Sequence, residues 1–119
     1  MTEEQIALAR RAVACRGWRF MGGMRVLDPI GPHPQRISDD DEGEASWRDD
    51  YWLPDLTDPA TLGCLLALVR EAWDQGSITP QVVSNKKWLL IYKGFGTPSR
   101  FFYGTTEVKV LVVALEAAP

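Results

Sequence analysis

Closely spaced carboxylates are the residues of this chain whose types and spacing could do chemistry. Between positions 39 and 58, nine acidic residues stand against the single base Arg48: Asp39, Asp40, Asp41, Glu42, Glu44, Asp49, Asp50, Asp55 and Asp58. Like charges that crowd together can raise the pKa of a carboxyl group enough for acid–base catalysis. Such catalysis also needs a second type of catalytic group, and none stands beside them in the sequence. A solvated, non-catalytic acidic segment is the better interpretation.

Other reactive residues do not combine into a known catalytic or metal-binding pattern. The one histidine, His33, lies between two prolines, and Cys15 and Cys64 are too far apart for a metal-binding pair. A G-x-S-x-G nucleophile motif is absent from the sequence. Gly22 and Gly23 follow a helical pattern and precede a strand, the reverse of a phosphate-binding loop. We therefore predict no enzyme activity, no catalytic residues, no metal site and no cofactor.

The acidic segment could instead bind a partner, because three large aromatic residues are interleaved with its charges. Dense negative charge resembles a nucleic-acid backbone and could enter a basic groove of a host protein. The predicted partner-binding residues are Asp39, Asp40, Asp41, Glu42, Glu44, Trp47, Asp49, Asp50, Tyr51 and Trp52. The same segment also fits a solvated hairpin tip whose aromatic side chains point into the core. Both interpretations remain open from the sequence.

A second candidate surface is the basic-aromatic hairpin at positions 86–103. It combines Lys86, Lys87, Trp88, Tyr92, Lys93, Phe95, Arg100, Phe101 and Tyr103. Interleaved bases and aromatics can stack on single-stranded nucleic acid and neutralise its phosphates. Residues 80–104 contain no acid, which favours this function. Against it, the residues at 88–92 are apolar on both faces, which predicts a strand buried on both sides.

Length and composition indicate one globular domain covering residues 1–119. The 45% hydrophobic content is typical of a folded protein, and the net charge is −3. The first residues do not resemble a signal peptide, and no apolar run is long enough to span a membrane. We expect a cytoplasmic protein with thiol rather than disulfide cysteines.

Helix signals mark three segments. Thr2 and Gln5 form a capping box ahead of a helix from about 3 to 15. Asp58 and Pro59 start a second helix, which stops near Gln75-Gly76. The last segment, to Ala118, has helical spacing in spite of its valines.

Extended segments lie between these helices. They are predicted at 24–27, 36–38, 46–53, 81–84, 88–93 and 100–103. The order helix, strands, helix, strands, helix predicts an α+β layered sandwich with a mainly antiparallel sheet.

Three stretches of the chain resemble small uncharacterised bacteriophage and prophage proteins. They are Leu53–Trp73, the closing Thr105–Ala118, and Ala12–Met21. Their layout is similar to that of phage α/β/α-sandwich domain proteins. The resemblance implies a phage origin, a location in the cytoplasm of the bacterial host, and no assigned catalytic residues.

Two functional hypotheses follow. The first is an inhibitor of a host nucleic-acid-handling protein, such as an anti-CRISPR or other counter-defence factor, that acts through the acidic segment. The alternative is a nucleic-acid-binding accessory protein that uses the basic-aromatic hairpin.

Overall fold

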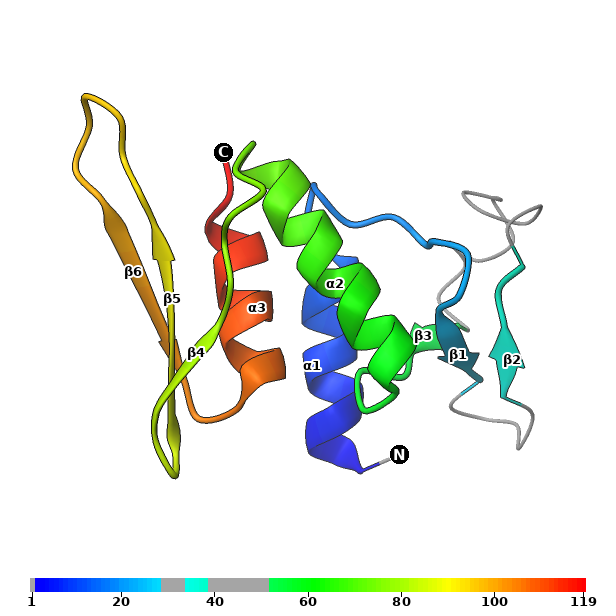
Figure 1. Ribbon diagram of the computed structural model, residues 1–119. Coiled ribbons are helices and arrows are strands. Elements are labelled where there is room, and N and C mark those ends of the chain that lie inside the picture. Colours follow the sequence, from blue (N-terminus) through cyan, green and yellow to red (C-terminus); the bar gives the residue numbers. More distant parts are fainter. Residues whose placement is uncertain (1, 29–33, 39–51) are drawn as a thin grey trace.

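The computed structural model describes residues 2–28, 34–38 and 52–119 and shows an α+β fold of three helices and six short strands (Figure 1). In chain order the elements are α1 (Glu3–Val13), β1 (Arg25–Leu27), β2 (Gln35–Arg36), β3 (Leu53–Pro54), α2 (Pro59–Ala72), β4 (Gln81–Ser84), β5 (Lys87–Tyr92), β6 (Arg100–Gly104) and α3 (Glu107–Ala117). The predicted α+β class and the order of helices and strands are confirmed.

The strands form two separate sheets, whereas the sequence predicted one mainly antiparallel sheet. One sheet has the order β2-β1-β3 and the other β4-β5-β6, and all of their pairings are antiparallel. The helices lie between the two sheets (Figure 1). Helix α2 has 14 residues, about 21 Å at 1.5 Å per residue, and carries the chain from one sheet to the other. This distance explains why the strands before and after α2 do not pair.

The helix starts are fixed by side chains, as their sequences predicted. The Gln5 N–H donates to Thr2 Oγ1 over 3.1 Å, and the Thr2 N–H donates to Gln5 Oε1 over 3.0 Å. The Thr61 N–H donates to Asp58 Oδ2 over 3.0 Å at the start of α2. Each bond satisfies a backbone donor that the first helical turn leaves without a partner. The C-terminal segment is helical, as predicted, and begins after Thr106.

Helix α3 lies at the centre of the core and contacts both the other helices and the sheet β4-β5-β6. Val110, Leu111, Val112, Ala114 and Leu115 are all buried. Because these valines are enclosed on several sides, their burial outweighs the weak helix propensity of a β-branched residue. The helix therefore serves as the support on which the sheet β4-β5-β6 rests.

Trp73 joins α2 to α3 and to the sheet. Its indole N–H donates to the Ala114 carbonyl over 2.8 Å. Its ring centroid lies 4.8 Å from that of Tyr92 and 5.6 Å from that of Phe102. The end of α2 is thus fixed against the inner side of β5 and β6.

The short strands differ from the prediction mainly in length. The predicted hairpin partner of residues 24–27 is present, since Arg25 pairs with Arg36 and Val26 with Gln35. Of the predicted strand at 46–53, residues 46–51 lie outside the described part of the chain, and β3 begins at Leu53.

Candidate functional site

The sheet β4-β5-β6 has two faces, and the cross-strand pair Leu90–Phe102 identifies the inner one. Both side chains are buried, and they pair directly across β5 and β6. Because successive side chains of a strand point to opposite sides, the neighbouring pairs Leu89–Tyr103 and Ile91–Phe101 point the other way. Lys87 lies two residues before Leu89 and shares its side. We call these five residues the outer face: Lys87, Leu89, Ile91, Phe101 and Tyr103.

Two aromatic side chains dominate the outer face. Phe101 is 54% exposed and Tyr103 is 52% exposed, and they are two of the five exposed large apolar side chains among the described residues. Leu89 and Ile91 are half-buried, and the helices lie on the other side of this sheet (Figure 1). The sequence predicted a strand buried on both faces at 88–92, and this was wrong. Both sides are apolar, but among the described elements helix α3 packs against the inner one.

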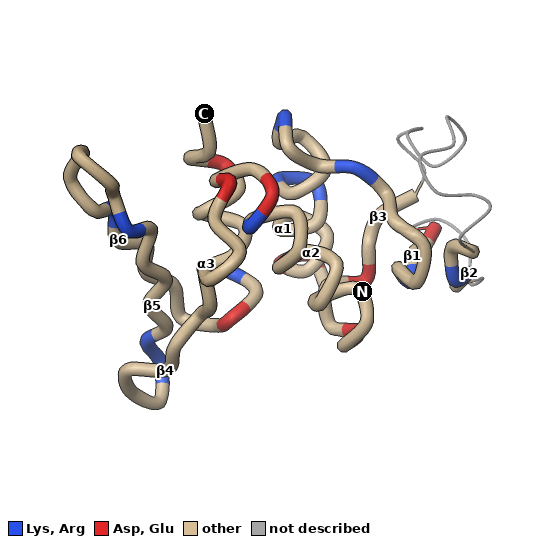
Figure 2. The backbone as a smooth tube through the Cα atoms, turned by 45° about the horizontal axis from the view of Figure 1, so that its top comes forward, with Lys and Arg blue, Asp and Glu red and all other residues tan. Residues whose placement is uncertain are grey.

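Positive charge accompanies the exposed rings. The Lys87 ammonium lies 4.9 Å from the centroid of the Tyr103 ring. Lys86 lies in the turn before Lys87, and Lys93 follows β5 at the opposite end of the strand. The hairpin of β5 and β6 carries basic residues and no acidic ones (Figure 2). The outer face is therefore a half-apolar surface with cations at both ends.

Other members of the predicted basic-aromatic hairpin belong to the inner face. Trp88 and Tyr92 pack against the core. The Arg100 guanidinium carbon lies 5.3 Å from the Trp73 ring centroid and 5.4 Å from that of Phe102. The predicted basic-aromatic hairpin included all of these residues because they are close in sequence. In the sheet they lie on two sides, because successive side chains of a strand alternate.

The predicted acidic site lies almost entirely outside the described residues. This applies to Asp39, Asp40, Asp41, Glu42, Glu44, Trp47, Asp49, Asp50 and Tyr51. Trp52 is described, and its partly buried side chain packs against the core. For Trp47 and Tyr51, both interpretations of the sequence stay predictions: the side chains point outward with the carboxylates, or inward to the core.

The two last carboxylates of the acidic run stabilise the fold. The buried Asp55 accepts from Arg25 over 2.8 Å and from the Thr57 hydroxyl over 2.5 Å. Asp58 accepts two hydrogen bonds from Arg36, of 2.8 and 3.1 Å, besides capping α2. The Arg36 guanidinium and the donors of Thr61 hold the pKa of Asp58 far below its ordinary value. These residues connect the sheet β2-β1-β3 to the start of α2.

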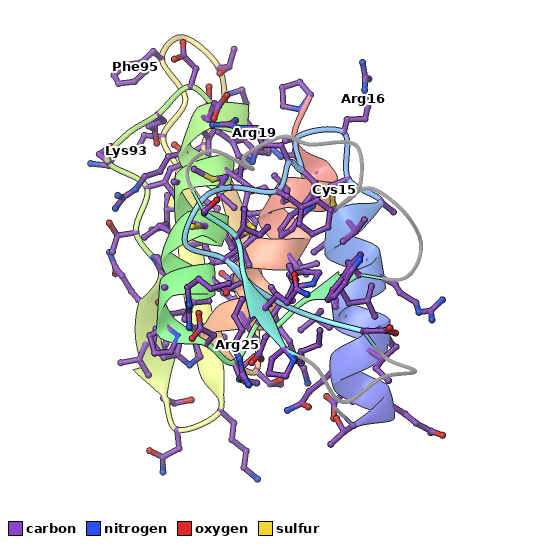
Figure 3. The ribbon with its side chains drawn as sticks, turned by 90° about the vertical axis from the view of Figure 1, so that its right-hand side faces the viewer. Cys15, Arg16, Arg19, Arg25, Lys93 and Phe95 are labelled. Atoms are coloured by element: carbon purple, nitrogen blue, oxygen red, sulfur yellow. The ribbon has the colours of Figure 1, made fainter. Side chains whose placement is uncertain are left out.

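A hollow of about 410 Å³ lies beside the end of α1. Its lining is Val13, Arg16, Trp18, Arg19 and Phe20. Arg19 is paired with Glu71 over 2.5 Å, and the Arg16 side chain points away from the protein body (Figure 3). The Trp18 indole N–H is buried and has no acceptor among the described residues. Because Arg19 is paired and Arg16 points outward (Figure 3), the two guanidinium groups do not meet in the hollow, and the outer face is the better candidate site.

The reactive side chains of the described residues do not gather into a metal-binding cluster. Among them, no three His, Cys, Asp or Glu side chains lie close enough together to bind a metal ion. Burial raises the pKa of the Cys15 thiol, which disfavours the reactive thiolate. His33 lies outside the described part of the chain. Within the described ranges, no helix has the length and apolar character that a membrane crossing requires.

Comparison with known proteins found no matching protein-family model, no similar curated protein and no similar solved structure. The phage resemblance of the sequence stays a prediction.

Proposed function

We propose that this protein is a non-enzymatic binding protein and that its outer face binds single-stranded nucleic acid. The observation that carries the proposal is the pair Phe101 and Tyr103, two residues apart on β6 and both more than half exposed. At about 3.4 Å per residue their side chains leave the strand about 6.8 Å apart. Two neighbouring unstacked bases could each lie on one ring.

The chemistry of stacking supports this use of the two rings. A base stacked on an aromatic side chain contributes about 1–3 kcal/mol, largely independent of its identity. Duplex bases are already stacked on one another and are not available to these rings. We therefore expect single strands to bind more tightly than duplexes, with little sequence preference.

The local charge supports a phosphate chain as the partner. The protein carries −3 overall, but residues 80–104 carry four cations and no carboxylate. Three of these cations, Lys86, Lys87 and Lys93, lie at the two ends of β5. An acidic protein would also suit the cations, but the exposed pair of rings specifically suits bases. The observations thus favour nucleic acid.

A second proposal concerns the acidic segment. It is favoured by the negative charge of the carboxylates other than Asp55 and Asp58. Asp55 and Asp58 are engaged within the fold. Seven acidic residues against Arg48 remain between positions 39 and 50. In this proposal the protein is a phage counter-defence factor in the bacterial cytoplasm, and the segment blocks the basic groove of a host protein. The two proposals involve different residues and can be tested separately.

Fluorescence anisotropy with labelled oligonucleotides tests the first proposal. Twelve-nucleotide single-stranded DNA, single-stranded RNA and duplex DNA are titrated with the protein at about 50 mM salt and again at about 200 mM. We expect both single strands to bind more tightly than the duplex and to weaken at the higher salt concentration. Failure of the single strands to bind at low salt would overturn the proposal. Equal competition by polyglutamate would also overturn it, because the site would then take an acidic polypeptide.

A further inference from the structure

Phe95 is the most exposed large apolar side chain of the described residues, with 86% of its surface accessible. It lies in the loop between β5 and β6, which extends past the ends of the helices (Figure 1). Its phenyl ring points away from the protein body, and Lys93 lies near the same end of the hairpin (Figure 3). A single exposed phenylalanine is ordinary. This one is notable because several contacts fix the loop that presents it.

The base of the loop is attached to the residues that follow α2. The Gln75 side-chain amide donates to the Lys93 carbonyl over 3.0 Å, and its oxygen accepts from the Lys93 N–H over 3.1 Å. One side chain therefore satisfies both backbone groups of the last residue before the turn. This pair of bonds holds the direction in which the loop leaves β5.

The turn itself requires the two glycines that flank Phe95. A Cβ at Gly94 would collide with the Thr97 carbonyl oxygen, so no larger residue fits there. Gly96 has a φ of +78°, which other residues rarely adopt. The Gly94 N–H donates to Ser99 Oγ over 3.3 Å and closes the turn. The backbone is thus built to hold Phe95 at the tip.

Phe95 belongs to the same hairpin as the two rings of the outer face and lies at its tip (Figure 1). From the tip toward the other end of β6, the exposed aromatic residues are Phe95, Phe101 and Tyr103. Lys93 and Lys87 lie near the two ends of this series. The distance from Tyr103 to the tip is roughly 20 Å, estimated from the strand rise.

We infer that Phe95 is a third stacking position of the outer face, so that a single strand runs lengthwise along β6 toward the loop tip. This inference rests on the proposed function. A short oligonucleotide can occupy only the pair Phe101 and Tyr103, and a longer one also reaches Phe95. The length of the oligonucleotide therefore decides whether Phe95 contributes to affinity.

A length series with Phe95→Ala tests the inference. Anisotropy is measured with labelled oligothymidylates of three to twelve nucleotides, on the wild type and the variant. We expect the variant to bind the twelve-nucleotide strand roughly 5- to 150-fold more weakly, the range expected for one lost stacking contact. The three-nucleotide strand should bind both proteins equally. Val82→Ala is the matched control, since Val82 is 62% exposed on the same sheet and pairs with the inner-face residue Trp88.

The possible outcomes separate this inference from the proposed function. If wild type and Phe95→Ala bind every length equally, Phe95 is not a stacking position and the inference fails, while the outer-face proposal stands. An equal loss at all lengths would contradict the lengthwise path. If the wild type binds no oligonucleotide, the proposed function itself fails.

Discussion

The Lys87 ammonium lies over the face of the Tyr103 ring, 4.9 Å from its centroid. The two residues belong to adjacent strands, β5 and β6, and share the outer face of the sheet. At an exposed position such a cation–π contact contributes about 0.5–1 kcal/mol. It also places a positive charge beside a ring on which a base could stack. A phosphate next to that base would meet the ammonium directly.

Removing this charge should weaken single-strand binding in a salt-dependent manner. Lys87→Gln should reduce the affinity and make the slope of log K against log salt shallower by about 0.7, the value for one phosphate contact with a single strand. Arg16→Gln is the control, because Arg16 is exposed beside the end of α1. Anisotropy titrations at several salt concentrations give both slopes. Equal slopes for Lys87→Gln and the wild type would show that Lys87 contacts no phosphate.

The two faces of β5 should respond differently to the same substitution. Leu90→Ala removes a fully buried side chain and should lower the free energy of unfolding by about 2–5 kcal/mol. Leu89→Ala alters the half-buried neighbour on the outer face and should cost less than half as much. Urea unfolding measures both values. A similar loss for the two variants would contradict the assignment of faces.

Alternation alone could not have revealed the outer face. The residues from Trp88 to Tyr92 are apolar on both sides, and the sequence therefore predicted a buried strand. After Gly104 the chain forms α3, which packs against β5 and β6. The path of this segment decides which side of the sheet is covered. That path depends on tertiary packing between residues distant in sequence.

Local signals, by contrast, were sufficient to locate the helices. Thr2 with Gln5, and Asp58 with Pro59, marked helix starts through bonds within a few residues. The division into two sheets could not be read in this way, because strand pairing joins distant segments. For the same reason the ion pair between Arg36 and Asp58, 22 positions apart, was not predicted.

The pair Arg36–Asp58 should make stability depend on pH in the acidic range. The pKa of Asp58 is lowered in the folded state, so its contribution is fully present above the ordinary carboxyl pKa of about 4. It should be lost progressively as the pH falls below about 4 toward the folded-state pKa. Urea unfolding at neutral and acidic pH measures this loss. Asp58→Asn should lack that part of the pH dependence.

Two substitutions of Asp58 distinguish its role as the N-cap of α2 from its role as a charged partner of Arg36. Asp58→Ala should lower the free energy of unfolding by about 1 kcal/mol or more, because the Thr61 N–H loses its acceptor. Asn retains an acceptor oxygen, so at neutral pH Asp58→Asn should be more stable than Asp58→Ala. If the wild type and Asp58→Asn lose stability in parallel on acidification, the ion pair does not cause the pH dependence.

The acidic-segment proposal predicts a different dependence on charge. A host partner is first recovered by co-purification and identified by mass spectrometry. Asp39, Asp40, Asp41, Glu42 and Glu44 are then all replaced by Ser, and partner affinity is measured against salt. We expect weaker binding and a shallower salt dependence in the variant, because fewer charges attract the basic groove. Unchanged affinity with an unchanged slope would exclude the segment as the binding surface.

The most direct test of the central claim is the dissociation constant of a twelve-nucleotide single strand for the double variant Phe101→Ala/Tyr103→Ala. Both side chains are more than half exposed, so the variant should remain folded, as urea unfolding can verify. Loss of two stacking contacts should weaken binding roughly 30-fold or more. The control Val82→Ala, on the opposite face, should bind like the wild type. Wild-type affinity in the double variant would contradict the claim that the outer face is the nucleic-acid-binding site.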